Sequence, residues 1–170
     1  WSSMAVFFRV NHVSRGVEAP LRNAGVPSAL VSGTEFFERR EVKDVVAYLR
    51  LVVNPRDDVA FRRAVAAPSR GIGRSTLEHM DGAARRRGGG LLEACAEIPV
   101  EVGSKARRAL EDLARLIGRL AASRATATLP ALIDEVLAGS GYRDALKAER
   151  TAEADTRLEN LEELIAASEE

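Results

Sequence analysis

The stretch that decides the fold is PSRGIGRST, residues 68–76, in which two glycines enclose one isoleucine. Apolar residues on both sides of it recur at helical spacing, which predicts a short hairpin between two helices. Gly71 and Gly73 permit backbone angles that are closed to other residues. We therefore expect exposed backbone amides here, next to the start of a helix that begins near Arg74.

Residues suited to binding phosphate surround this hairpin. A helix N-terminus with free N–H groups attracts an anion, and arginine and hydroxyl side chains add further donors. An ordinary glycine turn with solvated arginines is the alternative, and the spacing alone leaves both open. The candidate phosphate-contacting residues are Arg70, Gly71, Gly73, Arg74, Ser75 and Thr76.

A nucleotide-binding loop does not fit the same stretch. Gly73-Arg74-Ser75 imitates the end of a Walker motif, but Pro68 stands at its first glycine and arginine replaces the lysine. The dinucleotide fingerprint also follows a strand, whereas the segment before this hairpin has a helical pattern. Catalytic and metal-binding sets are missing too, since His12 and His79 have no Cys or His partners at ligand spacing.

Outward from the hairpin, the chain from residue 41 onward has a helical pattern. Before it, a short apolar run, a helix and a second short run predict a βαβ-like piece, which needs a larger sheet around it. The expected fold class is mainly α, with a short α/β segment at residues 1–33 and a helical region at residues 34–170. The expected strands are Ala5–Val10 and Ser28–Val31. After the expected helices Ser14–Ala24 and 41–53, Asp57 and Asp58 begin a further helix that carries Val59, Phe61, Ala64 and Val65. The remaining expected helices are 75–87, 91–96, Ser104–Ser123, Leu129–Leu137, Gly141–Lys147 and Asp155–Ala167.

One of these helices begins with mixed charges, Arg39-Arg40-Glu41-Val42-Lys43-Asp44. Opposite charges four residues apart stabilise an exposed helix surface. We therefore expect a solvated face here, with an ion pair between Arg40 and Asp44.

Charge is unevenly shared along a chain whose net charge is zero. Residues 1–124 hold 21 basic and 14 acidic residues, a net of +7, and residues 125–170 hold 4 and 11, a net of −7. Such asymmetry is typical of a protein with a polyanion-facing half, although an unevenly charged surface explains it equally well. The single cysteine, Cys95, forms no disulfide within the chain and fits a cytoplasmic location, and no apolar stretch is long enough for a membrane. Met4 lies inside an apolar run, which indicates a piece of a longer protein.

Several stretches together resemble the superfamily-one DNA helicases of the UvrD/PcrA/Rep type. The similarity runs in order along nearly the whole chain, and residues 41–51 and 71–73 are its most specific parts. Val10 stands where threonine is usual, and His12-Val13 replaces the common Ala-Gln. The stretches are AVFFRVNHVSR (5–15), GVP (25–27), GTEFFERREVKDVVAYLRLVVNPRDD (33–58), FRRAVAAPSRGIG (61–73) and RLENLEELIAA (157–167).

This resemblance implies a fold and roles for residues. It places the first stretch in the second RecA-like motor domain and the helical remainder in an inserted accessory subdomain, called 2B. Arg9 and Asn11 would then contact single-stranded DNA. The Gly-Ile-Gly hairpin, which includes Ile72, would contact the duplex backbone in the manner of a helix-hairpin-helix motif.

The resemblance also implies a parent enzyme, an ATP-dependent helicase that moves 3′ to 5′ and uses ATP and Mg²⁺. Its partners would be duplex and single-stranded DNA and the rest of the motor. This chain carries no Walker A lysine, Walker B acid or arginine finger, so we expect it to bind no cofactor and hydrolyse no ATP by itself. The alternative is a non-enzymatic helical protein–protein interaction module, which a P-loop upstream in the parent would exclude. The oligomeric state stays open.

Overall fold

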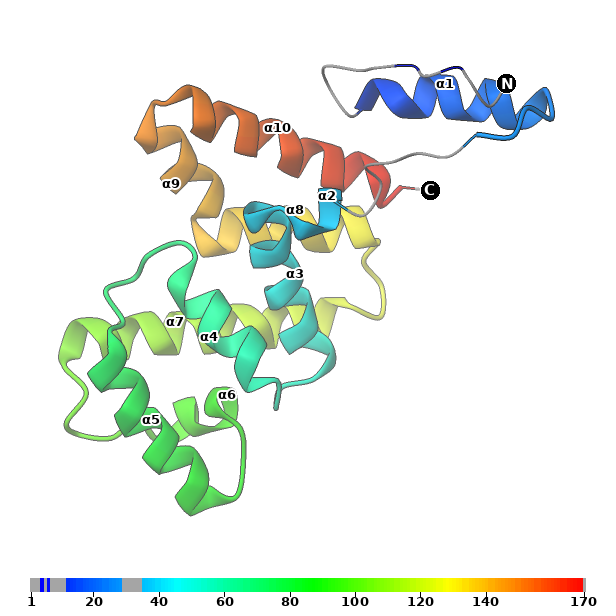
Figure 1. Ribbon diagram of the computed structural model, residues 1–170. Coiled ribbons are helices and arrows are strands. Elements are labelled where there is room, and N and C mark those ends of the chain that lie inside the picture. Colours follow the sequence, from blue (N-terminus) through cyan, green and yellow to red (C-terminus); the bar gives the residue numbers. More distant parts are fainter. Residues whose placement is uncertain (1–3, 5, 7–11, 29–34, 170) are drawn as a thin grey trace. The chain divides into compact units, whose positions relative to one another are not determined.

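The computed structural model describes residues 4, 6, 12–28 and 35–169, and the regular structure in these residues is helical (Figure 1). The expected mainly α fold is confirmed. The chain divides into one unit at Trp1–Arg39 and a second at Arg40–Glu170. The first unit contains α1 (His12–Asn23) and α2 (Glu35–Glu38). The second contains α3 (Arg40–Val53), α4 (Asp58–Ala66), α5 (Arg74–Arg87), α6 (Leu91–Ala94), a 3₁₀ turn (Cys95–Glu97), α7 (Ser104–Ser123), α8 (Leu129–Ser140), α9 (Tyr142–Glu149) and α10 (Ala152–Ala167).

In the first unit, the described residues allow only part of the predicted strand–helix–strand segment to be checked. Helix α1 corresponds to the helix expected at 14–24. The two expected strands, Ala5–Val10 and Ser28–Val31, fall almost entirely outside the described residues. The βαβ-like segment therefore stays a prediction.

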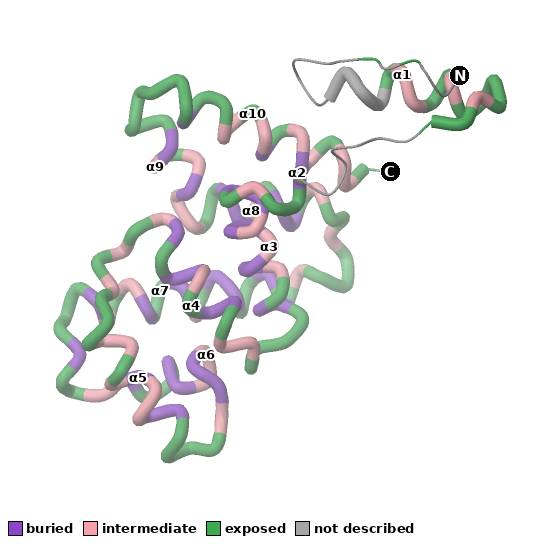
Figure 2. The backbone as a smooth tube through the Cα atoms, in the orientation of Figure 1, coloured by how far each residue is buried: buried purple, intermediate pink, exposed green. Residues whose placement is uncertain are grey.

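The core of the second unit forms around α3, which packs against α4, α7, α8 and α10. Figure 2 shows the buried segments of these helices gathered where they meet. Along α7 the buried leucine and isoleucine side chains are Leu110, Leu113, Leu116, Ile117 and Leu120, whereas Ala109 is only partly buried. Each buried leucine contributes about 1.5–3 kcal/mol to stability, so this apolar stripe holds α7 in place and turns its other face outward.

A capping carboxylate and two glycines mark the ends of three helices. Asp57 precedes α4, and its carboxylate accepts a hydrogen bond from the backbone N–H of Ala60 at 2.9 Å. That bond holds the pKa of Asp57 below its usual value, because it favours the charged carboxylate. Gly88 and Gly141 follow α5 and α8 with φ of +68° and +72°, the left-handed angles of a helix C-terminus.

The expectation of a solvated face at the start of α3 is wrong. Glu41 and Asp44 are only 4% and 3% exposed. The Asp44 carboxylate accepts hydrogen bonds from Arg63 Nε at 2.7 Å and from the Tyr142 hydroxyl at 2.8 Å. The expected ion pair between Arg40 and Asp44 is present, at 4.0 Å. Buried charge requires such partners, and these come from α4 and α9, so the charged start of α3 joins helices rather than facing water.

Candidate nucleic-acid interface

The hairpin between α4 and α5 contains one glycine whose backbone requires glycine. The Ala67–Pro68 peptide is cis, and Gly71 has φ of +70°, a left-handed angle that side chains disfavour. Gly73 has φ of −93° and ψ of 179°, extended values that any residue adopts. The prediction of glycine-only angles is therefore confirmed for Gly71 and wrong for Gly73.

The N-terminus of α5 is open at the surface. Its N-cap is Gly73, which has no side chain to accept from the first amides of the helix. These amides lack a partner within the helix, and the helix dipole adds partial positive charge at this end. Gly71, Gly73, Arg74 and Ser75 are exposed, and Ile72 and Thr76 are partly buried. An anion can approach the backbone amides here.

Arg74 is held only by a weak surface pair. Its Nε lies 2.9 Å from Glu78 Oε1, and the two side chains are 93% and 62% exposed. A pair exposed to this degree contributes less than about 1 kcal/mol. A phosphate beside the hairpin can therefore replace Glu78 as the partner of Arg74.

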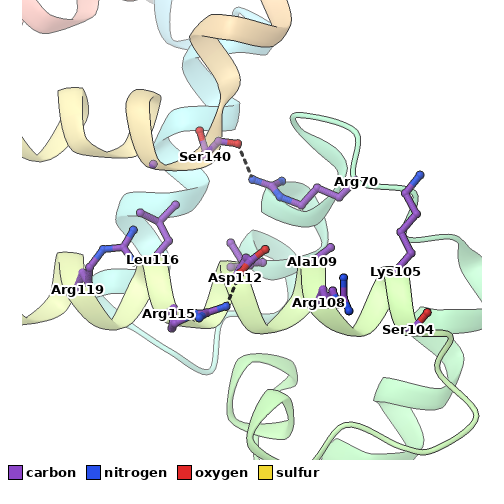
Figure 3. A pocket seen from close by; sticks show the side chains of 12 residues that line it. Arg70, Ser104, Lys105, Arg108, Ala109, Asp112, Arg115, Leu116, Arg119 and Ser140 are labelled. Atoms are coloured by element: carbon purple, nitrogen blue, oxygen red, sulfur yellow. Dashed lines mark hydrogen bonds and ion pairs between the residues drawn. The ribbon is translucent and has the colours of Figure 1, made fainter.

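Arg70 lies differently from its neighbours, because its guanidinium turns into the protein. Nη1 donates to the carbonyl oxygens of Ala64 (2.7 Å) and Pro68 (3.0 Å). Nη2 donates to the Tyr48 hydroxyl (2.7 Å) and to the carbonyl oxygen of Ser140 (3.2 Å), the latter drawn in Figure 3. Both terminal nitrogens are thus occupied within the protein, and Arg70 fixes the hairpin against α3, α4 and the end of α8.

Tyr48 is a supporting residue that the sequence reasoning missed. Its hydroxyl lies 2.6 Å from the carbonyl oxygen of Ala67 and accepts a bond from Arg70. Burial raises the pKa of Tyr48, and the charge of Arg70 opposes that shift only in part. The phenol therefore stays neutral and can donate. In the sequence, Tyr48 looks like one more apolar position of α3, so no pattern indicates that its hydroxyl supports the hairpin.

Lys105, on α7, lies beside the hairpin although it is more than thirty residues away in sequence. A β-carbon built on Gly71 would stand 3.8 Å from Lys105 Cε. Lys105 is the second residue of α7, whose N-cap, Gly103, also has no side chain that could cap the helix. The structure thus brings the end of the Lys105 side chain to Gly71, which the sequence reasoning did not anticipate.

The proposed single-strand contacts, Arg9 and Asn11, lie outside the described residues and stay predictions. In the part of the chain that the structure describes, no three His, Cys, Asp or Glu side chains gather in a way that could hold a metal ion. None of the described helices combines the length and the apolar character needed to cross a lipid bilayer.

Comparison with known proteins gives matches along nearly the whole length of the chain. Residues 1–170 match the family described as the UvrD-like helicase C-terminal domain. The chain is 38% identical over 168 residues to the ATP-dependent DNA helicase PcrA of Bacillus subtilis, which covers 98% of the chain. It is 40% identical over 166 residues to DNA helicase II of Escherichia coli, which covers 96% of the chain. It spans 23% of the length of each of these relatives. With a match over its full length, the chain belongs to the UvrD-like helicase C-terminal domain family.

Proposed function

We propose that the chain works as part of an ATP-dependent DNA helicase that moves 3′ to 5′ in the cytoplasm. Residues 34–170 would form the accessory 2B subdomain, and residues 1–33 would belong to the second motor domain. The family match and the names of the relatives support this assignment. ATP and Mg²⁺ bind to other parts of the motor in this account, and this chain contributes contacts with DNA.

The contribution of the second unit is to hold the duplex ahead of the fork through its phosphate backbone. The observation that carries this proposal is the open N-terminus of α5, which Gly71 turns toward the surface at φ of +70°. Backbone amides and Arg74 provide donors, and Ser75 and Thr76 add hydroxyl groups. These groups contact phosphates rather than base edges, so binding is insensitive to sequence and sensitive to salt.

Arg70 takes a positioning role in this account. Its bonds to Ala64, Pro68 and Ser140 set the direction in which the hairpin leaves α4. The residues left to contact the duplex are Gly71, Ile72, Gly73, Arg74, Ser75 and Thr76.

The sharpest test is Gly73→Ala. A β-carbon at this position meets no atom within 4 Å and the backbone angles suit alanine. The weaker N-cap and the stiffer unfolded chain nearly offset each other, so the free energy of unfolding should change by less than about 0.5 kcal/mol. The added methyl group, however, stands between the amides and a phosphate. We expect about tenfold weaker binding of a duplex, measured by fluorescence anisotropy, because a charge-assisted hydrogen bond contributes about 1.5–3 kcal/mol.

Gly118→Ala is the matched control, since a β-carbon there also meets no atom within 4 Å. It lies within α7, where alanine favours the helix, and should leave duplex binding unchanged. Binding by Gly73→Ala as tight as that of the parent chain would contradict the proposed contact. So would a parent chain that binds no duplex even at about 50 mM salt, where phosphate contacts are strong.

A further inference from the structure

A groove of about 770 Å³ runs along α7 beside the hairpin. Figure 3 shows side chains of α7 along it, with Arg70 and Ser140 across from them. It holds five cationic side chains and one carboxylate, a formal net charge of +4. We call it the basic groove, and its charged residues are Arg70, Lys105, Arg108, Asp112, Arg115 and Arg119.

Helical spacing puts the charged residues of α7 that line the groove on one face. Positions 105, 108, 112, 115 and 119 follow one another by three, four, three and four residues, so their side chains lie in a row. At 1.5 Å per residue the row is about 21 Å long. The opposite face of α7 is packed in the core, so the row stays turned toward solvent.

Most of this positive charge is not balanced by the protein. Asp112, the only carboxylate in the groove, pairs with Arg115. Among the described residues, Lys105, Arg108 and Arg119 form no ion pair or hydrogen bond, and all three are exposed. Arginines elsewhere in the second unit, such as Arg63 and Arg143, do have carboxylate partners. Like charges in a row repel one another, and an anion in the groove would relieve that repulsion.

We propose that the basic groove binds the phosphate backbone of the duplex that the hairpin contacts, and so extends that contact along α7. This inference rests on the proposed function, because the contact along the groove begins at the hairpin, where Lys105 adjoins Gly71. At about 21 Å, the row is long enough to meet several phosphates of the duplex. The lining includes no aromatic side chain, which favours backbone contacts over base stacking.

The test replaces the two unpaired arginines, in the double variant Arg108→Gln with Arg119→Gln. Both lie on the exposed face, so the fold should persist. Two lost phosphate contacts lower the slope of log affinity against log salt by about 1.8. The loss relative to the parent should therefore be about twelvefold larger at about 50 mM than at about 200 mM salt. The matched control removes two exposed charges outside the groove, Arg86→Gln with Lys147→Gln, and should keep the parent slope.

Two further experiments distinguish binding of the duplex along the whole basic groove from general electrostatic attraction to its positive charge. With a DNA stem-loop whose stem is about 4 base pairs, about 14 Å long at about 3.4 Å per base pair, the hairpin and the far end of the groove cannot be covered together. The groove variant should then lose only the contact of Arg108, and its salt slope should fall by about 0.9 rather than about 1.8. Asp112→Asn removes the only carboxylate and should strengthen binding of a long duplex. An unchanged salt slope for the groove variant on a long duplex would overturn the inference. If Gly73→Ala weakens duplex binding while the groove variant keeps the parent slope, the groove inference fails and the hairpin proposal stands. If the groove variant weakens duplex binding and Gly73→Ala does not, the hairpin proposal fails and the groove inference stands.

Discussion

At the scale of the residue, the two glycines of the hairpin have different tasks. Gly71 has φ of +70°, and an L side chain at such an angle is strained by about 1 kcal/mol or more. Gly71→Ala should therefore lower the free energy of unfolding by about 1 kcal/mol, while Gly71→Asn should lose less, because asparagine tolerates this region. Urea denaturation measures both. Equal stability of Gly71→Ala and Gly73→Ala would contradict the backbone described for the hairpin.

Arg70 shows why single residues are hard to assign from sequence. The local pattern predicts a phosphate donor, and it correctly predicts the hairpin around it. Two of the acceptors that occupy the guanidinium, Ala64 and Pro68, are near Arg70 in the chain. The other two, Tyr48 and Ser140, lie 22 and 70 residues away, so the local pattern contains no information about them. The same holds for Lys105, which only the tertiary fold brings to Gly71.

At the scale of the element, the buried carboxylate of Asp44 should couple α3 to α9. Tyr142→Phe removes the hydroxyl that donates to it at 2.8 Å and should lower the free energy of unfolding by about 1–2 kcal/mol. Burial, followed by the hydrogen bond to Asp44 and then the Asp44 charge, raises the pKa of Tyr142, so the phenol keeps its proton at neutral pH. A double-mutant cycle with Asp44→Ala, followed by urea unfolding, should give a coupling of about 0.5 kcal/mol or more. Strictly additive losses would show that the two helices are not joined through this bond.

Whole helices were the easiest part to predict. The apolar spacing of α7 predicts its bounds, Ser104–Ser123, as the structure has them, because one stripe of leucines faces the core along its whole length. At the start of α3 the expected solvated face is wrong for a related reason. Charges at i,i+4 spacing look alike whether they face water or a buried partner, and only the packing of α4 and α9 against α3 decides which.

At the scale of the molecule, the charge asymmetry of the sequence becomes a feature of the second unit. Every cation of the basic groove comes from the first 124 residues, which carry the net charge of +7. The spacing of positions 105, 108, 115 and 119 could have revealed a cationic helix face. That this face lies next to the hairpin depends on the turn after α6 and on the packing of α7 against α3, which the sequence pattern does not express.

The most direct test of the central claim, that backbone amides of the hairpin contact duplex phosphates, is an NMR titration of the ¹⁵N-labelled chain. On adding duplex DNA, the largest amide shifts should fall at residues 71–76, with further shifts along α7 from Lys105. A duplex with neutral methylphosphonate linkages should leave these amides in place, because the contact depends on phosphate charge. Duplex binding with unshifted amides at residues 71–76 would contradict the account.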